Sequence, residues 1–201
     1  MSLPKVRHGQ SARDGLAYDP HPLFTMEAVG MPRTQGSVNS TRTIQRGGKT
    51  VRLPVTSGWE DLKVWRHLIA VSAKNALTQG IRQGLWTRDQ FPLDEPVIAT
   101  VVYTVPRPQR PRFPAAATKP DIDKLDRALH DGLSIDAGIL REDSRIIGHL
   151  RHLKTYPNED FDALDEPGVM LVLWRSAHTE ARRRGGSSRA GSAPARAGAA
   201  R

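Results

Sequence analysis

The sequence of 201 residues has no cysteine, and nowhere do apolar residues run together for long. Without cysteine the chain has no disulfides, no thiolate zinc ligands and no thiol nucleophile, a composition that suits a reducing cytoplasm. A transmembrane helix needs about 18 or more consecutive apolar residues, and no such run is present. Residues 1–22 are polar and charged and contain no apolar core of a signal peptide. We therefore expect a cytoplasmic protein without a membrane segment.

Aromatic residues are also scarce, with four Trp, four Phe and three Tyr. Length and composition fit one domain of ordinary size with unstructured ends. We predict a flexible leader over residues 1–22, a domain over 23–175 and a disordered tail over 176–201. The tail has no large apolar residue, so it cannot bury enough surface to offset the entropy of ordering it.

Acidic residues are outnumbered, and the net charge is +9. The tail alone holds six arginines against Glu180. Such a tail binds nucleic acid by releasing counterions, or it serves only to keep the chain in solution. Residues 30–58 contain no acid at all, and we predict a long basic loop there, with a short hairpin around Gly47 and Gly48. Its expected phosphate contacts are Arg33, Arg42, Arg46 and Lys49; the alternative is a plain solvated loop.

Apolar spacing predicts the regular elements. Ser57 and Glu60 form a capping-box pattern before a helix whose apolar positions recur every three or four residues to about residues 77–80. A second helix is expected over 124–131, ended by Gly132. Strands are expected over residues 23–29, 96–105, 144–155 and 168–174. The sequence therefore predicts a single α/β (α+β) domain, with a mixed sheet of about four strands covered by two main helices.

A proline-rich cationic segment follows the apolar strand 96–105. Alternating prolines make this segment stiff and extended, and it leads directly to Lys119. Its charged side chains are Arg107, Arg110 and Arg112. We expect these arginines to contact a nucleic-acid backbone.

The most informative motif is Lys119-Pro120-Asp121-Ile122-Asp123-Lys124-Leu125, followed later by Glu142-Asp143. Carboxylates are the hard ligands that Mg²⁺ selects, and a basic protein with such a site indicates a phosphate polymer as substrate. Carboxylates about 5 Å apart repel by about 3 kcal/mol at an effective dielectric of about 20, so a cluster of three requires a cation or protonation. The alternatives are that Asp123 caps the second helix and that Asp143 is a turn residue.

Other site patterns fit less well. An EF-hand loop starting at Asp121 lacks an oxygen ligand at Leu125 and a glycine at Asp126. An Asp-x-Asp motif of the glycosyltransferase type is short and has no supporting nucleotide-sugar pocket. His149 and His152 differ by an odd number of residues, so on a regular strand they lie on opposite faces, and we expect them to be surface residues.

Several motifs together resemble the RusA-like Holliday junction resolvases, which are often encoded by prophages. The resemblance covers roughly residues 24–174. Besides the acidic motif, it rests on residues 30–37, the helix with Trp65, residues 131–133, residues 141–144 and the strand beginning at residues 167–169.

The resemblance implies a Mg²⁺-dependent endonuclease, with Mn²⁺ as a substitute metal, that works as a homodimer in DNA recombination and repair. Such an enzyme resolves four-way junctions by paired symmetric nicks. Asp121, Asp123 and Asp143 correspond to its metal-binding catalytic acids. Arg127 stands where the family has a functional lysine, and an arginine is a poor proton donor, so Lys119 or Lys124 is the nearest replacement in sequence.

The sequence is also compatible with two other functions. One is a basic junction-binding protein without catalysis, whose acids cap a helix. The other is a nuclease that prefers flaps or forks, which sequence alone does not distinguish from a junction resolvase. Lys119 and Lys124 are expected to contact DNA in either case.

Overall fold

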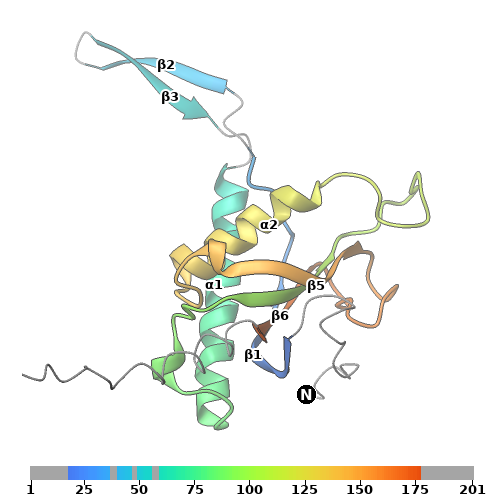
Figure 1. Cartoon of the computed structure of the whole chain (residues 1–201). Coiled ribbons are helices and arrows are strands. Elements are labelled where there is room, and N and C mark those ends of the chain that lie inside the picture. Colours follow the sequence, from blue (N-terminus) through green and yellow to red (C-terminus); the bar gives the residue numbers. More distant parts are fainter. Residues whose placement is uncertain (1–17, 37–39, 47–48, 56–58, 178–201) are drawn as a thin grey trace, which may run out of the picture.

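The computed structural model describes residues 18–36, 40–46, 49–55 and 59–177, and between residues 40 and 55 it describes the backbone alone. It contains a four-stranded sheet in the order β1-β6-β4-β5 and two long helices (Figure 1). The sheet strands are β1 (Tyr18–Val29), β4 (Val97–Thr104), β5 (Ile146–Thr155) and β6 (Gly168–Ser176). β6 pairs antiparallel with β1 and β4, whereas β4 and β5 are parallel. The prediction of a single α+β domain with a mixed sheet is confirmed.

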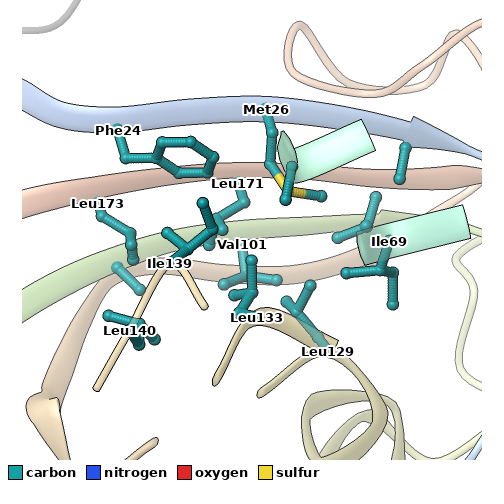
Figure 2. Close-up of a cluster of buried hydrophobic side chains, with 14 of the residues drawn as sticks. Phe24, Met26, Ile69, Val101, Leu129, Leu133, Ile139, Leu140, Leu171 and Leu173 are labelled. Atoms are coloured by element: carbon teal, nitrogen blue, oxygen red, sulfur yellow. The ribbon is translucent and has the colours of Figure 1, made fainter. Parts of the chain in front are cut away.

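Every residue of β4 is buried, as its continuous apolar sequence predicts for a central strand covered on both faces. One face carries the main core, which α1 (Trp59–Arg82) and α2 (Ile122–Asp131) cover with Trp65, Ile69 and Leu129. Figure 2 shows this layer, in which Phe24, Leu171 and other sheet residues face side chains from the helices. The opposite face carries a smaller apolar cluster, which is made of side chains of the strands themselves together with Leu164.

Three short helical segments join the main elements: η1 (Arg88–Gln90), η2 (Gly132–Asp136) and η3 (Asp143–Arg145). η2 is a π-helical turn that continues α2 beyond its C-cap residue Gly132. α1 ends a little later than predicted, and its predicted cap Ser57 lies outside the described residues. No helix in the described ranges combines the length and apolar character that crossing a membrane requires.

The predicted long basic loop is largely a hairpin. β2 (Ser40–Arg46) and β3 (Lys49–Val55) pair antiparallel along their whole length and project from the body of the molecule (Figure 1). The turn at residues 47–48 lies outside the described residues. Alternation of β-branched and polar residues over 40–55 favours strands, and the sequence reading gave this signal too little weight.

The N-terminal end of the folded domain begins earlier than predicted. β1 begins at Tyr18, so residues 18–22 of the predicted leader belong to the sheet, where Tyr18 pairs with Ser176. The remaining leader, residues 1–17, and most of the predicted basic tail, residues 178–201, lie outside the described residues.

β5 departs from a regular strand in a way that the sequence reading missed. Its pairing with β4 shifts twice, so that Ala99 lies opposite His149 and Val101 opposite His152. These bulges place both histidines on the face that packs toward the helices, and their rings stack with centroids 4.6 Å apart. The prediction of opposite faces was wrong because it assumed an unbroken period of two. The first shift skips Ile147, which has no partner in the β4 register and is 47% exposed.

Candidate active site

The segment at residues 30–36 lies against α2 and is fixed there by hydrogen bonds. The backbone N–H of Gln35 donates to the carbonyl oxygen of Lys124 at 2.9 Å. The side-chain Nε2 of Gln35 donates to Asp131 Oδ2 at 2.7 Å, and Arg66 donates to the same oxygen at 3.1 Å. Two motifs that are almost a hundred residues apart in sequence therefore meet in space.

The glycines of these motifs lie at close approaches between elements. Gly30 has φ of 152°, its N–H donates to the carbonyl oxygen of Pro167 at 2.8 Å, and a Cβ there would lie 2.7 Å from Leu68 Cδ1. A Cβ on Gly132 would lie 2.8 Å from Ile69 Cγ2. Larger residues do not fit without displacing the α1 side chains, so these motif positions hold the fold together.

Asp121 and Asp123 stand at the start of α2. Asp121 occupies the N-cap position, without a side-chain capping bond, and Asp123 lies in the first turn. The alternative that Asp123 caps this helix is therefore not met, because the N-cap residue is Asp121. A hydrogen bond from Lys124, 3.1 Å away, lowers the pKa of the Asp121 carboxyl below its ordinary value. Both acids are exposed, so their oxygens are accessible to a ligand.

Cationic groups surround this pair of acids. The Lys154 Nζ, from the end of β5, donates to the carbonyl oxygens of Thr118 and Pro120, just before α2. Burial lowers the pKa of the Lys154 ammonium. Lys119 is exposed beside it, and Arg127 is exposed one turn along α2. Within the described part of the chain, Arg127 makes no ion pair, so its guanidinium is available to an anion.

Asp143 lies at the other end of β5. It is the first residue of η3, which leads directly into β5, and it is exposed. The strand from Ile146 to Lys154 spans about 25 Å at the usual rise per residue. Since Lys154 contacts the segment that leads into Asp121, the structure places Asp143 and Asp121 at opposite ends of β5.

The three predicted metal ligands consequently do not fit one Mg²⁺ site within a single chain. Two oxygens on the same Mg²⁺ lie at most about 4 Å apart, because each Mg–O bond is about 2.1 Å long. Among the described residues, no group of three or more His, Asp or Glu side chains is arranged to hold a metal ion. The carboxylates have suitable chemistry, but the Mg²⁺ site stays a prediction.

The other predicted DNA contacts are spread over several elements. Arg33 pairs with Asp61 at 3.2 Å, and Arg107 pairs with Glu159 and lies over the Tyr156 ring. These two arginines would have to exchange a partner to bind phosphate. Arg110 and Arg112 are exposed on the proline-rich segment. The side chains of the hairpin residues lie outside the described part of the structure; they are Arg42, Arg46 and Lys49.

A polar cluster between α2 and β5 was missed by the sequence reading. Asp126 accepts a hydrogen bond from the Tyr103 hydroxyl at 2.9 Å, and His152 Nε2 lies 2.9 Å from its other oxygen. Burial raises the pKa of Asp126, but the bonds from His152 and Tyr103 outweigh it, so the pKa lies below the ordinary value. Gly148 within the strand pattern was the available signal, because an isolated glycine in a strand indicates a bulge.

Two further histidines of this cluster lack partners. The Nε2 atoms of His130 and His149 are buried and have no hydrogen bond within the described residues. Burial lowers the pKa of both imidazoles, and the neighbouring His152 lowers that of His149 further. The packing of α2 against β5 therefore favours the uncharged form of the His130 and His149 imidazoles.

No model of a known protein family matches the sequence, and no curated protein matches it significantly.

Proposed function

We propose that this chain is an endonuclease that acts on branched DNA, of the kind that resolves four-way junctions. The observation that carries the proposal is the convergence of the motifs on which the resemblance to the RusA-like resolvases rests. Residues 30–36 bind α2 through Gln35, and Gly30 binds the segment before β6. A chance resemblance would give no reason for separate motifs to contact one another.

The chemistry at the start of α2 supports the same proposal. Asp121 and Asp123 are exposed acids in a setting of lysines and arginines. Cations attract the phosphate backbone, while carboxylates without buried partners are free to bind an ion or orient a water molecule. Arg127, on the same side of α2 as Asp123, is placed to neutralise a phosphate.

Two copies of the chain are the expected unit. A four-way junction has approximate two-fold symmetry, and two symmetric nicks require two sites. Because Asp143 stands far from the other acids in one chain, a three-carboxylate site would need acids from two chains or a rearrangement of β5. Measuring the mass of the protein by sedimentation, with and without Mg²⁺, separates these arrangements. The absence of cysteine fits a cytoplasmic location for such an enzyme.

The separation of the acids also favours a second function. A basic protein that binds junctions without cutting them needs no metal site, and Asp121 at the N-cap position is then simply favourable for the helix. This candidate predicts tight junction binding that does not depend on divalent ions.

The deciding experiment uses labelled synthetic four-way junctions, flaps and linear duplexes. The full chain is incubated with each substrate in Mg²⁺, Mn²⁺ or EDTA, and the products are mapped on a denaturing gel. Paired nicks at symmetric positions of the junction, absent in EDTA, would support the proposed resolvase. Cuts confined to flaps would redefine the substrate. Tight junction binding without nicks in either metal would favour the non-catalytic binder.

A further inference from the structure

A surface groove of about 590 Å³ runs along α1 and η2, and none of the predicted site residues lines it. Its volume lies within the range of pockets that hold small organic molecules, about 300–1,000 Å³. Its apolar lining includes Trp59, Leu62, Ala70, Val71 and Ile135. Neither the core nor the proposed active site explains this groove.

Large apolar side chains stay exposed in the groove. Trp59 is 47% exposed and Ile135 is 70% exposed, although an isolated domain gains by burying such surface. The other three tryptophans of the chain are buried. Trp59 is thus a solvent-facing indole at the start of α1, and aromatic rings in such positions provide stacking platforms for nucleobases.

Carboxylates neutralise only some of the cationic side chains that line the groove. Arg66 is held by Asp131 and Asp136 and is not available to a ligand. Lys74 donates to a backbone carbonyl, that of Asp136, and no carboxylate within the described ranges neutralises it. Lys63 lies 5.3 Å from the centroid of the Trp59 ring, and its partner Glu60 is exposed, so this pair is weak.

This combination favours a nucleic-acid strand over a second copy of the chain. The centre of a protein–protein interface is depleted of charged residues, particularly lysine. By contrast, a site for single-stranded nucleic acid combines cations for the backbone with aromatic and apolar faces for the bases. The chain enters α1 from the β2–β3 hairpin, and the whole span from residue 30 to 58 carries no acid.

We propose that the α1 groove binds an unpaired stretch of a DNA strand, with a base stacked on Trp59 and the phosphates near Lys63 and Lys74. This proposal rests on the proposed function and extends it. Branched DNA has bases at the branch point that unpair readily, and the groove would hold such a strand while the acids at the start of α2 face the backbone elsewhere.

Tryptophan fluorescence tests the groove directly, because Trp59 is exposed whereas the other three tryptophans are buried. A short oligothymidylate is titrated into the full chain in EDTA, which prevents cleavage. We expect quenching that saturates with binding, and we expect Trp59→Phe to bind while losing most of this quenching. Binding with an unchanged emission, or equal quenching in Trp59→Phe, would overturn the proposal.

Affinity measurements by fluorescence anisotropy of a labelled oligothymidylate provide the second readout. Trp59→Ala should weaken binding about tenfold, in line with the usual loss of one base-stacking contact. Lys63→Ala and Lys74→Ala should each reduce the dependence of log K on log salt by about 0.7. Leu85→Ala and Arg88→Ala, exposed residues beyond the C-terminal end of α1, serve as matched controls and should change neither quantity.

The outcomes also separate this proposal from the proposed nuclease. If the protein cleaves junctions but Trp59→Ala does not weaken single-strand binding, only the proposal that the groove binds a strand is refuted. If oligothymidylate quenches Trp59 but junctions are not cleaved, only the proposed nuclease activity is refuted. A Trp59 emission that changes with protein concentration in the absence of DNA would show that a second copy of the chain occupies the groove, and would refute the strand.

Discussion

Replacing Asp126 by asparagine probes the polar cluster that joins α2 to β5. Asp126 receives hydrogen bonds from the fully buried Tyr103 and from His152. Asparagine has nearly the same shape and keeps one oxygen for the Tyr103 hydroxyl. The substitution therefore removes mainly the negative charge that His152 faces.

The size of the effect follows from the burial of this pair. Less than a third of either side chain is exposed, so solvent screens the interaction only in part. Hydrogen bonds to charged groups contribute about 1.5–3 kcal/mol to stability. We expect Asp126→Asn to lower the free energy of unfolding by about 2 kcal/mol near neutral pH, and the melting temperature by about 4–8 °C.

The pH dependence gives the prediction its sign. The folded-state pKa of Asp126 lies below the ordinary value, so the charge stabilises the fold above that value. The contribution disappears as the pH falls through the lower, folded-state pKa. Wild type and Asp126→Asn should therefore differ most near neutral pH and converge in strong acid.

Urea unfolding followed by circular dichroism at several pH values measures both quantities. Asp165→Asn is a suitable control, because Asp165 is exposed and has no ion pair within the described residues. Its effect should stay within about 0.5 kcal/mol. If Asp126→Asn were as stable as this control at neutral pH, the cluster would not contribute as argued.

Three further predictions concern the same elements. Burial lowers the pKa values of His130 and His149 below 6.5. The stability that the two neutral imidazoles contribute is therefore complete above pH 6.5 and is lost as the pH falls toward their folded-state pKa values. A free energy of unfolding in urea that stays constant from pH 7 to 5 would contradict this. Gly132→Ala should lower the free energy of unfolding by about 1–3 kcal/mol, because the added Cβ would contact Ile69 too closely, and thermal unfolding measures this loss. An unchanged melting temperature would show that α1 accommodates the added methyl group without loss of stability. Asp123→Asn should abolish junction nicking and leave junction binding intact or tighter, and retained cutting on the denaturing gel would remove Asp123 from the candidate site.

Local pattern was enough to predict most of the elements. These elements are recognised from residues that are close together in the sequence. Examples are the apolar run of β4, the spacing of apolar residues by three and four around Trp65, and the acid-rich start of α2. Helix bounds were less accurate, as the position of Asp123 shows, because capping depends on backbone geometry. The hairpin was expected only as a short feature of a loop, although β-branched and polar residues alternate over residues 40–55.

The positions of the acids and histidines depended on tertiary pairing. Sequence places Asp143 twenty residues after Asp123, but only the contact of Lys154, at the end of β5, with the segment before α2 puts Asp143 and Asp121 at opposite ends of that strand. The pairing of β5 with β4 creates the bulges that bring His149 and His152 together beneath α2. The sequence by itself determined the α+β class, the buried central strand and the basic, cysteine-free character of the chain. Where the charged groups meet was decided by the tertiary structure, because register is fixed by hydrogen bonds between residues distant in sequence.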